Sequence, residues 1–332
     1  MKYSNSGSVG RFEVITVLVC LVILAVMGVP WLQAARAEAR ELLCQDHLRQ
    51  LGLALQRYEA AHGGFPPRRT GFNNGKPYGG WGGQILPFLE GPESSSSYDP
   101  RYDFFDPKNQ SAVATRLPQM MCPASPTDRH VEIQSQASTK SLNPDKSSVF
   151  RCRAAVSDFI TSNGVLMTDG GYGVNAMSGA RRIGNQRQPM TDDENLPLSK
   201  IVDGLSNTLL LIEQAGRPAA WRNGAKLEGD GQFGVSPNAR GAWAGWGSIA
   251  FGAVDCDTGE RPGRGDSSDC SVNCNNWFGI YSFHRDGAGV LFCDGSVRFV
   301  GTELDPITFA HMTVRDDGHL IDLDLVSVEV SP

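Results

Sequence analysis

The feature that most constrains this chain is an apolar stretch near its start that continues into an amphipathic one. Val14 to Leu32 holds nineteen positions without a formal charge, about the length with which a helix crosses ~30 Å of hydrocarbon. Apolar positions then recur at alternating steps of four and three residues: Cys44, Leu48, Leu51, Leu55 and Tyr58. That spacing places them on one face of a helix. The pattern predicts one long helix, half in lipid and half the spine of a globular domain.

Glycine and proline residues set the division of the chain. Gly63-Gly64, followed by Phe65-Pro66-Pro67, end the helix. The 38 glycines and 19 prolines of the chain predict many turns and short strands beyond that point. We therefore expect a cytoplasmic or leader segment at 1–13, a transmembrane part at 14–32, an amphipathic spine at 33–62, and an exported β-rich head with loops at 63–332.

Two simpler interpretations of the apolar stretch stay open. In a secretory signal peptide, Lys2 and Arg11 would form the basic region and Ala35-Arg36-Ala37 would fit the cleavage rule. Against it, the apolar core is long, and cleavage would remove the first part of the helix. The second alternative is a plain membrane anchor with an unrelated domain behind it.

Two residues of the apolar half are unusual for a membrane span. Glu13 heads the run, where an acid usually has a partner, and Pro30, seventeen residues later, should kink or loosen the helix. This arrangement resembles type IV pilins and type II secretion pseudopilins, in which the glutamate meets the N-terminal amine of a neighbouring subunit. The family's processing site, a glycine directly before a phenylalanine, is not matched, because Arg11 separates Gly10 from Phe12.

Charge limits the partners and the orientation. The net charge is −6 with no basic cluster, which excludes nucleic acid as an expected partner. Lys2 and Arg11 precede the span, and the positive-inside rule then predicts a cytoplasmic N-terminus. We expect a single-pass protein of the inner membrane whose head is periplasmic or at the cell surface.

Three cysteines lie together in a loop rich in Gly, Asp and Ser. Cys270 and Cys274 are spaced for a local disulfide or for a bridge from one of them to Cys256, and disulfides persist in exported proteins. Free thiols are the alternative. A zinc site is disfavoured, because this loop contains no His and no second pair of cysteines exists.

Several segments have a clear local pattern. Leu209 to Glu213 predicts a strand buried on both faces. Asp294-Gly295 between two apolar runs, 289–293 and 296–300, predicts a hairpin with a tight two-residue turn. We also expect a helix at 307–312 after Asp305-Pro306 and a terminal strand at 320–330. Trp243 and Trp246 are expected in the core or over a sheet edge.

A set of motifs in a fixed order resembles one family along nearly the whole chain. His284, nine residues and Asp294-Gly295 look like the "H-x9-DG" signature of a large group of planctomycete pilin-like proteins, a domain of unknown function often labelled type II secretion protein G-like. The other blocks that agree are Pro30 with Gln33-Ala34-Ala35-Arg36, Cys44 with Leu48–Ala54, Tyr58, Phe65-Pro66-Pro67, Leu86–Glu90, Cys122-Pro123, Asp203-Gly204 with Ser206-Asn207-Thr208, Glu213, and Ser282-Phe283-His284. The resemblance implies an α+β fold of type IV pilin kind, a long helix on an antiparallel β-rich head, and no established activity.

Catalysis is not expected from these motifs. His284, Asp294, Asp203, Ser206 and Glu213 include the residue types of a hydrolase triad, but no Gly-x-Ser-x-Gly elbow is present. A triad is recognised by geometry. We expect His284 to bond to a neighbouring turn and cap the hairpin, and Asp203 and Asp294 to fix turns.

Two ligand-binding alternatives stay open. Asp255, Asp257, Asp266 and Asp269 lie in a loop whose composition would suit Ca²⁺, without the spacing of an EF-hand, so no cofactor is expected beyond a possible calcium ion. Aromatic residues between Trp221 and Trp246 would suit a sugar surface, but core packing accounts for them more simply. No small-molecule substrate is indicated.

The sequence therefore predicts a non-enzymatic, membrane-anchored protein of pseudopilin type, a component of a type II secretion or type IV pilus-like system. Its partners would be the membrane and pilin-like subunits, identical or related, with Glu13 in the contact between helices. The alternative is a solitary anchored adhesion or ligand-binding protein that never polymerises.

Overall fold

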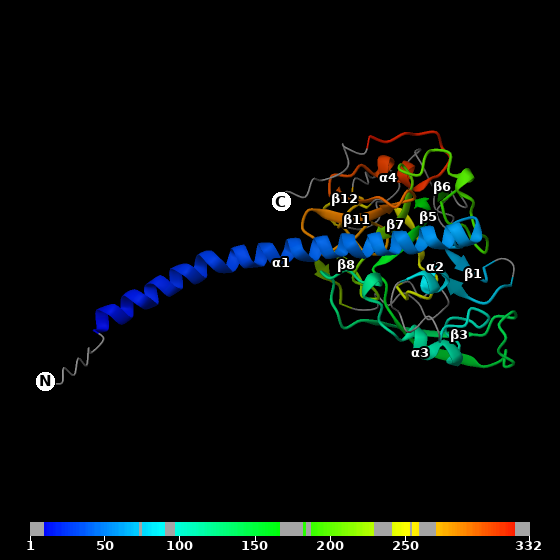
Figure 1. Ribbon diagram of the computed structural model, residues 1–332, viewed down its shortest axis with the longest axis horizontal. Coiled ribbons are helices and arrows are strands. Elements are labelled where there is room, and N and C mark those ends of the chain that lie inside the picture. Colours follow the sequence, from blue (N-terminus) through cyan, green and yellow to red (C-terminus); the bar gives the residue numbers. More distant parts are fainter. Residues whose placement is uncertain are drawn as a thin grey trace.

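One helix, α1, runs from Arg11 to His62 without interruption and at ~1.5 Å per residue is about 80 Å long. In this computed structural model its first half projects from the rest of the chain and curves gently, while its second half lies across the head (Figure 1). Pro30 lies inside the helix without breaking it. The structure describes residues 10–72, 75–89, 97–166, 182–183, 187–228, 241–252, 254–258 and 270–322.

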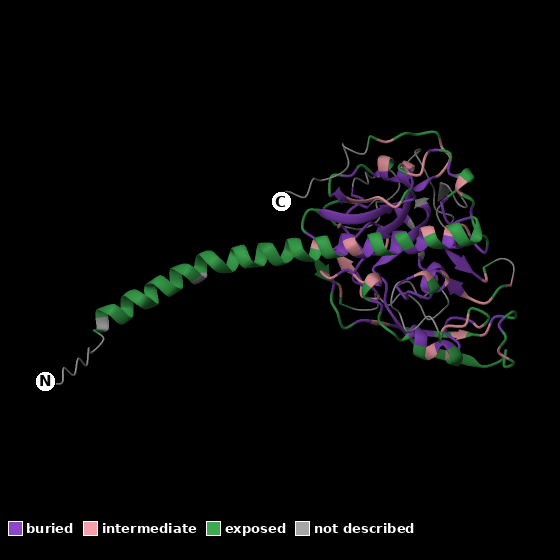
Figure 2. Cartoon of the chain, in the orientation of Figure 1, coloured by how far each residue is buried: buried purple, intermediate pink, exposed green. Residues whose placement is uncertain are grey.

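The projecting half of α1 has the character of a membrane span. Its large apolar side chains are exposed; Leu24, for example, is 66% accessible. Figure 2 shows this half exposed along its length, in contrast to the half on the head. It is the one helix among the described residues that is long and apolar enough to cross a membrane.

The second half of α1 is the spine of the head, as its spacing predicts. The five apolar residues of the predicted face are all buried: Cys44, Leu48, Leu51, Leu55 and Tyr58. Gly52 allows the closest approach to the sheet, because a Cβ there would lie 2.9 Å from Leu291 Cδ1. The helix ends at Gly63, whose φ of 73° is left-handed and whose N–H bonds to the Glu59 carbonyl at 2.7 Å.

The spine packs on a six-stranded mixed sheet. Its strand order is β10-β5-β7-β11-β12, with β6 also paired to β5. All pairs are antiparallel except β10 with β5, which is parallel, so the predicted antiparallel head is corrected at this one edge. The strands are β5 (Phe159–Leu166), β6 (Arg182–Ile183), β7 (Leu209–Glu213), β10 (Ser248–Gly252), β11 (Gly287–Phe292) and β12 (Val297–Gly301).

Short elements complete the head around this sheet. Three two-stranded sheets pair β1 (Arg69–Thr70) with β2 (Gly79–Gly80), β3 (His130–Gln136) with β4 (Val149–Ala155), and β8 (Trp221–Arg222) with β9 (Ala225–Lys226). The short helices are α2 (Trp81–Ile85), α3 (Gln110–Val113) and α4 (Pro306–Thr313), and the 3-10 turns are η1 (Leu86–Phe88), η3 (Pro107–Asn109), η4 (Pro118–Met120) and η5 (Leu198–Lys200).

Most local predictions for the head are confirmed. Strand β7 is buried at all five positions, and Asp305 caps α4 by accepting the Thr308 N–H at 2.8 Å. Trp243 and Trp246 are buried, with their indole N–H groups bonded to the carbonyls of Thr115 and Thr70. The predicted strand at 320–330 lies largely outside the described residues, and residues 320–322 are not in a strand.

The β11–β12 hairpin forms, but its turn differs from the predicted one. The Gly295 N–H bonds to the Phe292 carbonyl at 3.0 Å, and Gly295 is the last residue of that turn, with a φ of 90°. Across the loop, the Phe292 N–H bonds to the Ser296 carbonyl at 2.9 Å. The loop is therefore the three residues Cys293 to Gly295, with a left-handed glycine at its end, and Asp294-Gly295 is not a two-residue turn. The Gln56 side chain of α1 donates to the Asp294 carbonyl at 2.8 Å, so this loop also docks against the spine.

Candidate functional site

Four chemically active side chains from distant parts of the chain meet beneath the spine. They are Cys44 on α1, Cys122 just after η4, Glu213 at the end of β7, and His284 in the loop before β11. One ligand atom from each, the two sulfurs, a carboxylate oxygen and a ring nitrogen, all lie within 4.8 Å of one another. All four residues are buried. We call this group the CCEH cluster.

The imidazole of His284 lies between the other members of the cluster. Its Nε2 is 3.2 Å from Cys122 Sγ and 3.8 Å from Glu213 Oε1. The same ring nitrogen thus faces both the sulfur and the carboxylate. The sequence-based prediction that His284 caps the hairpin is therefore wrong in its partner: the ring points into the cluster.

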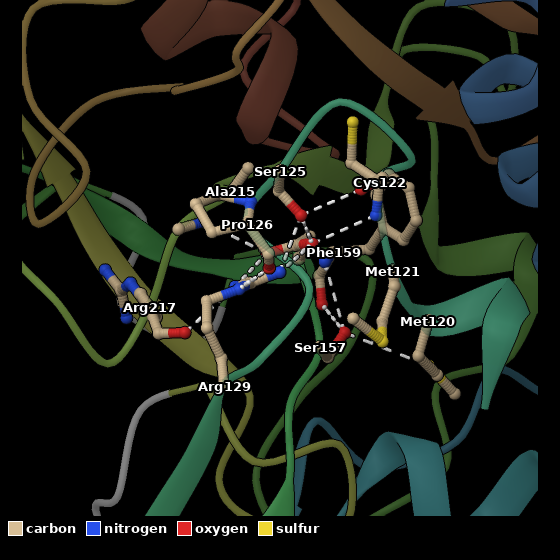
Figure 3. A network of polar contacts seen from close by, with 12 residues as sticks. Met120, Met121, Cys122, Ser125, Pro126, Arg129, Ser157, Phe159, Ala215 and Arg217 are labelled. Atoms are coloured by element: carbon tan, nitrogen blue, oxygen red, sulfur yellow. Dashed lines mark hydrogen bonds and ion pairs between the residues drawn. The ribbon is translucent and has the colours of Figure 1, made fainter. Parts of the chain in front are cut away.

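A buried ion pair holds the backbone at Cys122. The Asp158 carboxylate accepts hydrogen bonds from the Cys122 N–H at 2.9 Å and the Ser125 hydroxyl at 2.6 Å, and it pairs with Arg129 at 2.7 Å. Figure 3 shows this network, with the sulfur of Cys122 pointing away from Arg129. His47 on α1 also bonds to the neighbouring Met121 carbonyl at 2.8 Å. These contacts fix the backbone from which the thiol projects.

Glu213 is held from one side only. Its Oε2 accepts the Gly289 N–H at 2.9 Å, whereas its Oε1 has no hydrogen-bond partner among the described residues. Glycine at 289 leaves room for the cluster, because a Cβ there would meet Leu48 Cδ1 at 2.8 Å and would lie 4.0 Å from Cys44 Sγ. The unpaired oxygen is the one that faces His284.

Short polar contacts position the loop that carries His284. The Ser282 hydroxyl accepts the His284 N–H at 3.0 Å. The Asn273 side chain accepts the Ser282 N–H at 2.8 Å and donates to the carbonyls of His284 and Gly287, each at 3.2 Å. The ring packs edge-on against Phe299, 5.9 Å between centroids. The imidazole therefore has a defined orientation.

Burial keeps the members of the cluster uncharged. It raises the pKa of Cys122 to about 12 and the pKa of Glu213 to about 8, although the Gly289 N–H favours the carboxylate. The pKa of Cys44 is well above its ordinary value, through its contact with Cys122 and through burial. Burial, with Arg40, lowers the pKa of His284 to about 4. Four neutral donors face one another near pH 7.

The arrangement differs from that around a nucleophilic cysteine. A cysteine nucleophile needs a lowered pKa and access to substrate, and Cys122 has neither, being 2% exposed. In a triad the base uses one ring nitrogen for the nucleophile and the other for the acid. Here Nε2 faces both Cys122 and Glu213. Two sulfurs, an imidazole nitrogen and a carboxylate oxygen are instead ligands that Zn²⁺ takes in proteins.

The Asp203 motif is a structural turn, as predicted. The Asp203 carboxylate accepts the N–H groups of Asp317 at 2.6 Å and Gly318 at 2.9 Å, and Asn207 donates to the Asp203 carbonyl at 3.0 Å. Gly204 has a φ of 100°, which favours glycine, and Ser206 is exposed in the same turn. This motif is separate from the CCEH cluster.

Asp294 also fixes a turn, in agreement with the sequence. Its Oδ1 accepts the N–H and the hydroxyl of Ser296 at 2.8 and 2.6 Å. Together with Asp203 it contributes no group to the CCEH cluster. The predicted motif residues therefore separate: Glu213 and His284 meet in the cluster, and the aspartates with their glycines shape turns.

The cysteine-rich loop contains the predicted local bridge. Cys270 and Cys274 form a disulfide, so neither is bonded to Cys256. Of the weak calcium candidates, Asp255 accepts the N–H and hydroxyl of Thr258 within its own turn, and the Asp257 carbonyl accepts from Asn223. Asp266 and Asp269 lie outside the described residues.

The remaining predicted residues lie in α1. The Glu13 carboxylate accepts the Gly10 N–H at 2.9 Å at the start of the helix, the acid position that complements a helix N-terminus.

Another group of His and Asp, made of His311, Asp317 and His319, is less buried than the CCEH cluster.

Sequence reasoning did not find the CCEH cluster, because its members are spaced by more than seventy residues at every step. Metal motifs recognised from sequence have two ligands close together. A signal was nevertheless present: all four residues fall in the motif blocks that carry the family resemblance. The convergence itself arises from packing of α1 on the sheet.

A family model described as a protein of unknown function, DUF1559, matches residues 33–306, which includes all four members of the CCEH cluster. No curated protein matches the chain, and no solved structure matches it, so the likeness to type IV pilins has no structural counterpart among them. The chain belongs to the DUF1559 family of proteins of unknown function.

Proposed function

We propose that the chain is a non-enzymatic, membrane-anchored subunit of pseudopilin type, which associates with identical or related subunits through its N-terminal helix. The observation that supports this most is the continuity of α1: one helix is exposed and apolar over Val14–Leu32 and is the buried spine of the head from Cys44 onward. A plain anchor joined to an unrelated domain would not need this rigid continuation.

Exposed apolar helix faces associate in lipid through close packing and interhelical polar contacts. Glu13 begins the span, and its carboxylate accepts a hydrogen bond from the Gly10 N–H at the start of the same helix. A carboxylate has further lone pairs with which it can bind a cation. An N-terminal amine of a neighbouring subunit would be such a cation. Glu13 is therefore the residue to which we assign the contact between helices.

The proposed location is the inner membrane, with a cytoplasmic N-terminus and the head in the periplasm or at the surface. The Cys270–Cys274 disulfide supports an oxidising compartment for the head. The alternative of a solitary anchored protein is favoured by the irregular processing site at Gly10-Arg11-Phe12. Both proposals share the anchor and differ in assembly.

Crosslinking in native membranes separates the two. Single cysteines are placed at consecutive positions 16 to 22 of a Cys20→Ser chain, and disulfide formation between copies is measured after oxidation. We expect crosslinked dimers at positions that recur with a helical period, weakened by Glu13→Gln. The unmodified Cys20→Ser chain is the control.

Absence of crosslinks at every position, in a chain that still fractionates with membranes, would overturn assembly and leave the solitary anchor. Sequencing the mature N-terminus tests whether the apolar stretch is a cleaved signal peptide, because a start near Glu38 would make the chain a secreted protein.

A further inference from the structure

We propose that Cys44, Cys122, Glu213 and His284 form a structural metal site of the zinc class, which fastens the spine helix to the head. The site would take one divalent ion with affinity for thiolate and imidazole. It is independent of how the N-terminal half of α1 associates, so the proposal holds for a solitary protein and for an assembled subunit alike.

The geometry of the CCEH cluster fits tetrahedral coordination. With bonds of about 2.0 to 2.3 Å, the ligand atoms of a zinc tetrahedron lie roughly 3.3 to 3.8 Å apart. Cys122 Sγ and His284 Nε2 are 3.2 Å apart, and His284 Nε2 and Glu213 Oε1 are 3.8 Å apart. All four ligand atoms fall within 4.8 Å of one another, so small side-chain shifts bring them to one ion.

An unsatisfied buried atom points independently to a ligand. The Glu213 side chain is 0% exposed, and its Oε1 has no hydrogen-bond partner among the described residues. An orphaned buried polar atom is costly and calls for a water, an ion or a ligand to complete its bonding. A cation held between the sulfurs and His284 would complete its coordination.

A disulfide between Cys44 and Cys122 is the main competing arrangement. It would join the same two segments, but it would use neither His284 Nε2 nor Glu213 Oε1, which would still lack a hydrogen-bond partner among the described residues. A metal ion uses all four groups at once. The chemistry of the whole cluster therefore favours the ion over the bridge.

The donor set limits the class of metal. Mg²⁺ and Ca²⁺ take oxygen ligands almost exclusively, and this cluster offers one carboxylate. Two thiolates with one imidazole suit Zn²⁺ and related first-row ions. Four protein ligands in a buried position form a closed site, which is the arrangement of structural and not of catalytic zinc. Binding Zn²⁺ would displace the protons of Cys44, Cys122 and Glu213.

The position of the site gives it a mechanical purpose. It joins α1 to the end of β7, to the turn after η4 and to the loop before β11. Cys44 is the first buried residue of the spine face, so the ion would lie where α1 leaves the head. Tension on the exposed half of the helix would reach this point first.

The test uses the full-length chain in detergent micelles, without a polyhistidine tag. Bound metal is measured by mass spectrometry, and the chelated, reduced protein is then titrated with Zn²⁺ or Co²⁺. We expect about one Zn²⁺ per chain. Co²⁺ should give the thiolate-to-cobalt absorption band and the strong visible bands of tetrahedral coordination.

Matched variants locate the site. Cys44→Ser, Cys122→Ser and His284→Ala should each lose the bound metal and the thiolate band, with an affinity at least tenfold lower. Cys152→Ser removes another buried cysteine outside the cluster and should keep both. Where a variant fails to fold, the unmodified chain gives the same information. Added Zn²⁺ should slow the alkylation of Cys44 and Cys122 relative to the chelated protein.

Two results would overturn the proposal. One is a purified chain that holds no more metal than Cys122→Ser and gives no thiolate band with Co²⁺. The other is a Cys44–Cys122 disulfide found by peptide mapping, with an intact mass two hydrogens lower than the Cys270–Cys274 disulfide alone explains. Neither result bears on helix association in the membrane, so this proposal and the proposed function fail separately.

Discussion

Single buried charges decide how segments far apart in this sequence are held together. Arg68 and Arg69 both pair with Asp192, at 2.6 and 2.7 Å, and the carboxylate has no exposed surface. Each guanidinium makes a second bond to the same carboxylate, both at 2.9 Å. This fork ties the chain just after α1 to the segment before η5. Loss of the Asp192 carboxylate would leave two buried cations without this negative charge.

Asp192→Asn is therefore expected to destabilise the head strongly, by about 3 to 5 kcal/mol in the free energy of unfolding, as for a broken buried pair. The measurement is denaturant unfolding of the full chain, followed by tryptophan fluorescence. Asp128→Asn is the control: Asp128 pairs with Arg116 at 3.0 Å, but its side chain is 94% exposed. That change should cost about 1 kcal/mol or less.

The buried Asp192 should also make the stability of the head sensitive to acid. Burial raises the pKa of Asp192, but hydrogen bonds from Arg68 and Arg69 lower it further, and its folded-state pKa lies well below the ordinary value. The stability it contributes is therefore present above the unfolded pKa of about 3.9 and is lost as the pH falls toward the folded pKa. The difference in the free energy of unfolding between the unmodified chain and Asp192→Asn should therefore become smaller below about pH 4. A difference that grows there would contradict this assignment.

At the scale of elements, the spine helix shows how far a local pattern reaches. Spacing along the sequence identified the buried face from Cys44 to Tyr58, and all of its predicted positions are buried. The strand β7 and helix α4 were likewise predictable, because a buried run and a capped start are local signals. The hairpin was predicted, but its turn was misassigned, since Gly295 closes a longer loop.

The candidate site was beyond such reasoning. Whether Cys44 meets His284 depends on the register of α1 on β11 and on the network around Asp158, and neither leaves a pattern along the chain. The parallel pairing of β10 with β5 is equally non-local. Local sequence specifies faces and turns, whereas packing of distant segments brings the donors together.

The docking of the spine gives a prediction within one helix. Leu51 is 0% exposed against the head, whereas Leu53, two residues on, is 45% exposed. Leu51→Ala should cost about 2 to 5 kcal/mol through lost burial and a cavity, and Leu53→Ala about 0.5 kcal/mol or less. Unfolding in denaturant measures both. Equal effects at the two positions would mean that the helix packs in another register.

At the scale of the molecule, an exposed apolar rod and a head with a sealed core share one helix. The head buries its largest aromatic side chains, among them Trp81 and Trp243. By contrast, the residues of α1 before the head expose theirs, with Trp31 75% accessible. A helix with so much exposed apolar surface needs another apolar surface to cover it. Lipid and neighbouring helices both supply one, and lipid is the first requirement of either proposal above.

Membrane attachment should therefore depend on the rod and not on the head. Leu21→Arg with Leu24→Arg places two charges in the span, each costing about 2.5 to 3.5 kcal/mol at the centre of a membrane helix. The doubly charged chain should appear in the soluble fraction after alkaline extraction, whereas Leu21→Ala with Leu24→Ala stays with the membrane. Both positions are exposed and away from the head, so its unfolding midpoint should not change. If the doubly charged chain still sediments with membranes, the head itself binds the envelope, and the rod is not the anchor.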